Sequence, residues 1–243
     1  MMASRFRVEN WAARAPGRES RAQWQCWAGA AGDAVAGTPG KDLPMMLRRR
    51  LTATGQAALA AAGEANAPRE ARYVFCSRHG EFTRTTRLLQ AVAEREALSP
   101  ADFSVSVHNA LAGILSIASQ SQEGHTAIAN GPDSFAAGLI EAIGLLAVHA
   151  DVPVLLVYFD DDLPSPYDEI EPPEAEGSLA LAVLLTAGGE TGLPVRVTVS
   201  AAADAAPAGT TRQALDFVRF LASGEAERAT AGGTFDLRWR RAD

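Results

Sequence analysis

The apolar positions of this chain fall into short runs, and the longest group of runs lies near its middle. Residues 126–129 form a short apolar segment, an Asn-Gly-Pro tripeptide interrupts it, and residues 133–149 leave no wide polar face. Residues 152–159 follow as a continuous apolar run rich in valine and leucine. A helix that is apolar all round is typical of a domain interior, and such a strand run is typical of a strand covered on both faces. The pattern therefore predicts strand, tight turn, buried helix and buried strand.

The predicted central helix, residues 133–149, has further features of an interior element. Pro132 lacks an N–H and has a fixed φ, so it suits the first position of a helix. Glu141 is the only charge inside the segment, and glycine and alanine fill much of the rest. Small residues allow neighbouring elements to approach closely. We expect a layered α/β domain with this helix at its centre.

The remaining elements are predicted from the period of the hydrophobic positions and from the glycine and proline residues that interrupt them. We expect strands at residues 6–8, 72–77, 178–186, 195–200 and 232–240. We expect helices at residues 44–62, 83–96, 109–119 and 210–221. Residues 103–108 alternate between apolar and polar side chains, which predicts a strand or an extended lead-in. Segments 29–40, 163–177 and 201–209 are predicted loops, and with no repeat or clear linker residues 1–243 form a single domain.

Composition excludes several functions. The chain has 243 residues and a formal net charge of −7, so nucleic acid is not an expected partner. One basic cluster, Arg48-Arg49-Arg50, is either a solvated helix face or a docking patch for an acidic carrier protein. The N-terminus has no apolar core of signal-peptide length, and the apolar central segment is too short and too charged at Glu141 for a clean membrane span.

The two cysteines, Cys26 and Cys76, form neither a disulfide framework nor a zinc pattern. Reduced thiols fit the cytoplasm best. No glycine-rich phosphate loop is present, and we expect no cofactor. Asp160, Asp161 and Asp162 end a predicted strand, but successive strand side chains point to opposite faces, so we expect no metal site.

Two residues are candidate nucleophiles. Ser134 stands at the start of the central helix, where backbone N–H groups could hold an oxyanion, but it lacks the G-x-S-x-G context and also suits helix capping. Cys76 precedes His79 by three residues, and the pair could be catalytic, although a buried thiol explains Cys76 equally well. His108 is a candidate site residue or a structural one, and His125 and His149 suit surface or capping roles.

Four stretches resemble a known family. The resemblance rests on CSRHGE (76–81), SPADFSVSVHNALAGILSI (99–117), TAIANGPDSFAAGLIEA (126–142) and EAEGSLALAVL (174–184). Their order is similar to that in ketoacyl synthases of the thiolase superfamily, and more narrowly to the short ketosynthase-like proteins called chain length factors. The resemblance implies a thiolase-like layered α/β fold, corresponding to the N-terminal half of a ketoacyl synthase with a truncated second half.

The departures from that family concern its catalytic residues. The alignment of strand and helix puts Pro132 where a synthase carries its acylated cysteine, so there is no catalytic residue at the nucleophile position. Synthases also use two histidines from the second half of their fold, and no histidine follows His149. The resemblance therefore implies a chain that does not condense acyl groups by itself.

The resemblance also implies partners. It predicts a heterodimer with an active β-ketoacyl synthase that acts on acyl carrier protein substrates in fatty-acid-like polyketide or aryl polyene biosynthesis. In thiolase-like dimers the strand before the nucleophile turn, here residues 125–129, pairs across the two-fold axis. The candidate tunnel or interface residues are His125, Thr126, Ile128, Phe135, His108 and Asn109. The alternatives are a stand-alone acyl transferase or thioester hydrolase using Ser134 or Cys76, and a purely structural assembly subunit.

Overall fold

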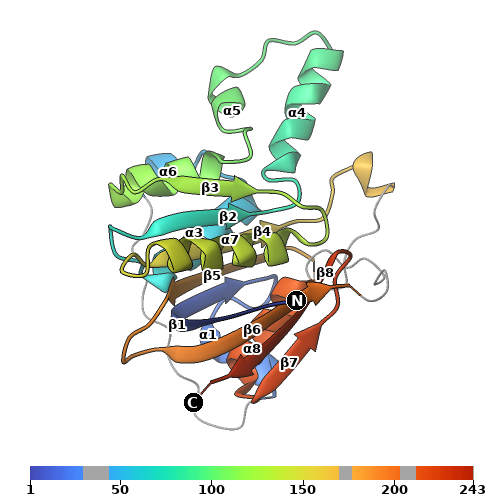
Figure 1. The fold of residues 1–243 in the computed structure, drawn as a ribbon. Coiled ribbons are helices and arrows are strands. Elements are labelled where there is room, and N and C mark those ends of the chain that lie inside the picture. The colour runs from blue at the N-terminus through green and yellow to red at the C-terminus, as the bar shows by residue number, and fades with distance from the viewer. Residues whose placement is uncertain (30–43, 170–176, 203–211, 243) are drawn as a thin grey trace.

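A single mixed sheet of eight strands organises the protein (Figure 1). The computed structural model describes residues 1–29, 44–169, 177–202 and 212–242. The strands are β1 (Met2–Arg14), β2 (Arg72–Cys76), β3 (His125–Ile128), β4 (Val154–Asp160), β5 (Leu179–Thr186), β6 (Leu193–Ala201), β7 (Glu227–Thr230) and β8 (Phe235–Arg241).

Helices connect and cover these strands. They are α1 (Arg21–Trp27), α2 (Met45–Arg48), α3 (Ala53–Ala65), α4 (Phe82–Ala93), α5 (Pro100–Ser104), α6 (Ala110–Ser119), α7 (Ser134–Val148), α8 (Arg212–Ser223) and the short 3₁₀ helix η1 (Tyr167–Glu169). The central helix is thus present as α7, and the apolar runs on either side of it are β3 and β4.

The strand order is β3-β2-β4-β5-β1-β6-β8-β7. Strand β2 pairs in parallel with both β3 and β4, whereas every other neighbouring pair is antiparallel. Parallel neighbours require crossover connections, and helices supply them here. Strand β3 therefore forms one edge of the sheet, and β7 forms the other.

The two faces of the sheet differ in how far they are covered. On one face α7, α8 and the inward residues of six strands form one apolar cluster. Phe135 lies within it, fully buried against the rings of Tyr158, Phe217 and Trp239. On the other face α3 and α6 form a second cluster over β2, β4 and β5. Every residue of β4 is buried as a result.

Helix α7 departs from the expectation of an all-round buried helix. Its side toward the sheet is buried, and Gly138 lies so close to Cys76 that an added Cβ would be 2.5 Å from Sγ. Along the opposite side Gly144, Ala147 and Val148 are exposed, Val148 by 75%. The apolar pattern was that of a buried helix, but in this chain nothing described covers that side.

The expected strand or extended segment at residues 103–108 is wrong, because residues 100–104 form helix α5. Ser99 caps it by accepting a hydrogen bond from the N–H of Asp102 at 3.2 Å, and Pro100 occupies its first turn. These helix-start signals outweigh a short alternation of side chains.

Other helix and strand boundaries also differ from the predicted ones. The predicted helix 44–62 is two helices, because Thr52 caps α3 by accepting from the N–H of Gly55 at 3.1 Å. Helix α1 and strand β7 were not predicted, and β1 is much longer than residues 6–8. The loops predicted at 29–40 and 201–209, part of 163–177, and the start of the helix at 210–221 lie largely outside the described residues.

Candidate functional site

The turn before α7 holds no free nucleophile. Pro132 is exposed and follows Gly131, whose φ of 53° suits glycine. Ser134 is buried, and its hydroxyl donates to the carbonyl of Gly131 at 2.7 Å and accepts from the N–H of Asn130 at 2.9 Å. Ser134 therefore stabilises the turn before α7 and does not cap the helix, because the N-cap residue is Asp133 and the Ser134 hydroxyl bonds to the preceding turn.

Cys76 has the environment of an inert thiol. Its side chain is fully buried, and Sγ lies 3.6 Å from the carbonyl oxygen of Val157. Burial raises the pKa of Cys76 strongly, and the nearby charge of Asp160 adds to that rise. His79 instead packs against the ring of Phe82 at 5.4 Å. Since neither Ser134 nor Cys76 has a nucleophile's surroundings, the geometry gives no support to a stand-alone transferase or hydrolase.

Asp133 connects the turn before α7 to the C-terminal part of the chain through hydrogen bonds. This buried carboxylate accepts from Gln213 Nε2 at 3.0 Å, from the N–H of Gly233 at 3.1 Å and from the N–H of Thr234 at 2.6 Å. A Cβ on Gly232 would overlap both Asp133 and Gln213, so glycine is required there. No local pattern along the chain signals this contact, through which the C-terminal segment holds the start of α7 in place.

Four predicted interface residues meet at the β3 edge. Asn109 Nδ2 lies 3.4 Å from His125 Nε2, and Thr126 Oγ1 lies 3.3 Å from Glu141 Oε1 on α7. Ile128 packs, partly buried, against the first apolar cluster. Among the described strands β3 has only β2 as a neighbour, so the backbone groups on its other side have no strand partner in that part of the chain.

The two remaining candidates lie elsewhere. His108 precedes Asn109, but its Nε2 lies 2.9 Å from the carbonyl oxygen of Ser77, a bond that orients the ring toward the loop after β2. Phe135 is inside the aromatic core and does not reach the surface. The structure therefore places His125, Thr126, Asn109 and Ile128 at the β3 edge, with Ile128 packed against the apolar cluster that contains Phe135.

The sequence did not reveal an exposed apolar surface formed by helices α4 and α5. Helices α4 and α5 stand away from the rest of the molecule (Figure 1) and have no buried residue between them. Val92 is 58% exposed and Phe103 63% exposed, and Leu89, Leu98 and Val107 are exposed too. The apolar stripe of α4 was visible as Leu88, Leu89 and Val92, but only the structure shows that no described element covers it.

Two of the aspartates at the end of β4 interact with neighbouring side chains of the protein. Asp160 lies 3.8 Å from Arg78 Nε, and Asp161 accepts a hydrogen bond from Thr54. Among the described residues no cluster of three or more histidines, cysteines or carboxylates could hold a metal ion.

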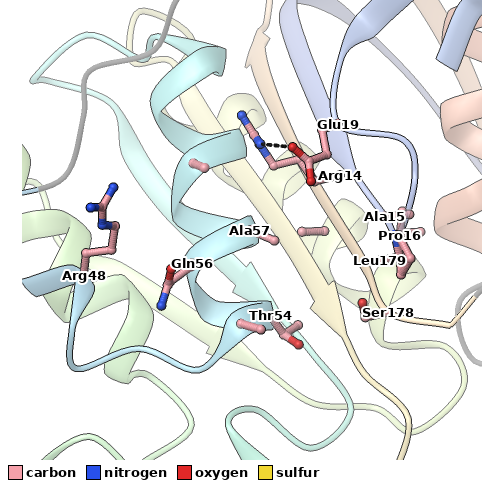
Figure 2. Close-up of a pocket in the computed structure, with 13 residues that line it drawn as sticks. Arg14, Ala15, Pro16, Glu19, Arg48, Thr54, Gln56, Ala57, Ser178 and Leu179 are labelled. Atoms are coloured by element: carbon pink, nitrogen blue, oxygen red, sulfur yellow. Dashed lines mark ion pairs between the residues drawn. The ribbon is translucent and has the colours of Figure 1, made fainter. Parts of the chain in front are cut away.

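A cavity of about 380 Å³ lies apart from the β3 edge (Figure 2). Its walls come from α3, the end of β1 and the start of β5, with Arg48 at one side and the Arg14–Glu19 pair at another. None of the predicted site residues lines it.

The chain belongs to the β-ketoacyl synthase family. Residues 22–240 match the family described as "Beta-ketoacyl synthase, N-terminal domain". No curated protein sequence matches the chain.

Solved structures agree with that membership. The ketosynthase (ApeO) in complex with its chain length factor (ApeC) from Xenorhabdus doucetiae matches with 28% identity and a TM-score of 0.80, over 97% of this chain and 99% of that chain. The ishigamide ketosynthase/chain length factor matches with 16% identity and a TM-score of 0.62, over 88% of this chain and 73% of that chain. A β-ketoacyl synthase from Burkholderia phymatum STM815 matches with 10% identity and a TM-score of 0.59, over 92% and 71%.

The last two matches show the fold alone. Together with the first, they confirm the thiolase-like ketosynthase fold and the resemblance to ketosynthase-like chain length factors. Within the described residues, Gly131–Val148 is long and apolar enough to cross a membrane, but half of it is buried, as in the core helix of a globular protein.

Proposed function

We propose that this protein is a non-catalytic chain length factor that pairs with an active β-ketoacyl synthase and helps to set the length of its product. The observation that carries the proposal is the open β3 edge, flanked by the exposed sides of α7 and of the α4–α5 pair. The setting we propose is fatty-acid-like polyketide or aryl polyene biosynthesis in the cytoplasm, with acyl carrier protein as a second partner.

The absence of condensing residues supports the non-catalytic part. Pro132 stands at the nucleophile position, and the four histidines of the sequence end at His149. A chain without a thiol at the acylation position cannot form the acyl-enzyme by itself, so the partner must supply that chemistry.

The shape of the open edge supports the pairing part. An unpaired edge strand is a template for another chain, and backbone pairing gives affinity while flanking side chains give specificity. The exposed apolar residues of α4, α5 and α7 would add buried area on either side of such a pairing. Two similar structures contain a ketosynthase with a chain length factor, and a third contains a type II acyl-carrier protein in complex with its ketosynthase.

The first experiment is co-expression with a ketosynthase partner, only the partner being tagged, followed by mass determination of the purified species. We expect a one-to-one complex that elongates carrier-bound chains, with the ketosynthase alone inactive or insoluble. Purification of this chain alone, with thioesterase activity and no affinity for the synthase, would overturn the proposal.

A backbone variant tests the edge directly. Tyr73 N–H and Ser77 N–H bond to the carbonyls of Gly124 and Ile128, so the alternate residue Ala127 directs its backbone groups away from β2. Ala127→Pro removes an outward N–H and should abolish co-purification, whereas Ala127→Val keeps that group and should retain it. Circular dichroism and thermal melting establish that both variants fold.

Product length tests the residues proposed to limit the chain. Phe135→Leu reduces bulk in the core at modest cost to stability, and Phe103→Ala removes an exposed ring from α5. A shift of the reconstituted pair toward longer products in either variant assigns that residue a part in length control. Unchanged products in Phe135→Leu would exclude Phe135.

A further inference from the structure

The side chain of Asp133 does not cap the helix that it precedes. Asp133 is the N-cap residue of α7, and an aspartate there usually accepts a hydrogen bond from the first backbone N–H groups of its own helix. In this protein it makes no such bond. Its carboxylate instead contacts the loop between β7 and β8, which lies 100 residues further along the chain. This loop therefore competes successfully with a local partner.

Three neutral donors converge on the Asp133 carboxylate. The consecutive N–H groups of Gly233 and Thr234 donate to Oδ1 at 3.1 Å and to Oδ2 at 2.6 Å. Gln213 Nε2, in the first turn of α8, donates to Oδ1 at 3.0 Å. Both oxygens thus have a donor, so the arrangement holds the whole carboxylate group. We call these three donors the carboxylate cradle.

The carboxylate cradle stabilises a buried carboxylate without a cation. Asp133 is 2% exposed, and none of the ion pairs between described residues includes it. A carboxylate removed from water needs strong hydrogen bonds in exchange, and oriented backbone N–H groups are the usual means of binding an anion without a cationic side chain. The carboxylate cradle therefore has the properties of an anion-binding site whose occupant is part of the chain.

The orientation of the Gln213 amide is an independent sign that the carboxylate cradle is built for an anion. Gln213 is 1% exposed, and its Nε2 also donates to the carbonyl of Phe235 at 2.9 Å. Its Oε1 is buried and has no hydrogen-bond partner among the described residues. An unpartnered buried acceptor is costly. The amide is thus held with its donor toward the carboxylate at the expense of its own oxygen.

The backbone of the loop approaches this occupant closely. A Cβ on Gly232 would lie 2.2 Å from both Asp133 Oδ1 and Gln213 Nε2, and a Cβ on Gly233 would lie 3.2 Å from Asp133 Oδ2. Glycine at both positions therefore makes room for a carboxylate. Gly233 and Thr234 are themselves exposed, so solvent can reach the carboxylate cradle once the Asp133 side chain is removed.

We propose that the carboxylate cradle is a binding site for small carboxylates, which Asp133 occupies and thereby closes. The donors define the ligand class, because three neutral N–H donors match the two oxygens of a carboxylate and provide no cation for a phosphate. Asp133 is tethered beside the donors, so its high effective concentration excludes free carboxylates from the unmodified chain. The site directly follows Pro132, so the chain itself closes this turn to acidic ligands. The inference is independent of the proposed pairing, since every contact lies within one chain.

Chemical rescue tests the proposal. Asp133→Ala removes a group of the size of formate and leaves the three donors in place. We expect this variant to melt at a lower temperature than the unmodified chain in sodium chloride, and to recover most of that loss in sodium formate of the same concentration. The recovery should grow with formate concentration, as for a ligand that binds only the folded state. Acetate should restore less than formate, and propionate should act like chloride, because the vacated space is small.

Two variants serve as matched controls. Asp133→Asn keeps the bulk of the side chain but places an amide against N–H donors, so it should lose stability and leave no room for formate. Asp236→Ala removes another carboxylate that accepts from a backbone N–H, that of Gly232 at 3.2 Å, at a partly exposed position outside the carboxylate cradle. Formate and chloride should therefore act alike on Asp236→Ala and on the unmodified chain.

Titration of ¹³C-formate, followed by its NMR line width, measures binding directly. Saturable broadening with Asp133→Ala and none with Asp133→Asn would support the carboxylate cradle. Equal melting of Asp133→Ala in formate and chloride, or the same gain from formate in either control variant or in the unmodified chain, would overturn the proposal. If Asp133→Ala does not fold in chloride, its refolding yield in the two salts is compared by circular dichroism. Equal yields, including no folding in either salt, also count against it.

Discussion

The two halves of the sheet, β3-β2-β4-β5 and β1-β6-β8-β7, differ in how many of their faces are covered by helices. In the first half, β4 has helices on both faces, and all seven of its residues are buried. In the second half, β6 and β8 are covered on one face only, and every second residue is polar or exposed. The pattern of apolar and polar residues along a strand therefore indicates whether one or both of its faces are covered. An outward position on an uncovered face is in contact with water and is usually polar.

The largest expected difference between the halves comes from a carboxylate introduced into each. Val157→Asp places a charge in the buried middle of β4 and should destabilise the protein by about 3 kcal/mol or more. Thr198→Asp places the same group on the open face of β6 and should change stability by less than about 0.5 kcal/mol. Urea unfolding measures both. Equal losses would mean that the outward face of β6 is covered in solution.

The contact between Asp133, before α7, and the segment around Gly232, between β7 and β8, joins the two halves. Stability should be next most sensitive to substitution there. Gly232→Ala drives a methyl group into Asp133, Gln213 and the carbonyl of Phe235, and should cost about 1–3 kcal/mol through overpacking and lost hydrogen bonds. Gly188→Ala is the control, because a Cβ there meets nothing within 4 Å. A neutral Gly232→Ala variant in thermal melting would argue against a tight joint.

Helix α7 allows the same comparison along one element. A Cβ at Gly138 would be 2.8 Å from the Cβ of Cys76, so Gly138→Ala should destabilise by about 1–2 kcal/mol. Gly144 is exposed with open space around it, so Gly144→Ala should stabilise the isolated chain by up to about 1 kcal/mol. Denaturant unfolding of the two variants gives opposite signs if the described packing is right.

The smallest expected effect is a pH dependence confined to the first half, where His79 lies. Partial burial, followed by the charges of Arg78 and His108, lowers the pKa of His79 below 6.5. A folded pKa below the unfolded one favours the neutral ring, so this contribution is present above about pH 6.5 and is lost as the pH falls. Because the ring is partly exposed, solvent screening should keep the effect below about 1 kcal/mol. His79→Gln should reduce the loss of stability between pH 7 and pH 5, and an unchanged pH profile would contradict this.

Much of the first half of the sheet could be predicted from the sequence. The elements that the sequence did not predict were missed for physical reasons. Strands β2, β4 and β5 and helix α6 fall close to their predicted ranges, because apolar period and glycine or proline breaks are local signals. Strand β7 was missed because four residues with one buried position carry little pattern. Of the candidate residues, Cys76 is the buried thiol that the sequence allowed. The burial of Phe135 in an aromatic core depends on α8 and β8, which are distant in sequence.

The sequence by itself determined the family of this protein, because the stretches that resemble ketoacyl synthases are local patterns along the chain. Only the tertiary structure decided which surfaces remain open. Which elements pack against which decides the exposure of the β3 edge, of one side of α7, of the projecting α4 and α5 and of the outward face of β6 and β8. Such exposure results from long-range contacts, and an apolar or alternating run has the same local pattern whether or not another element covers it.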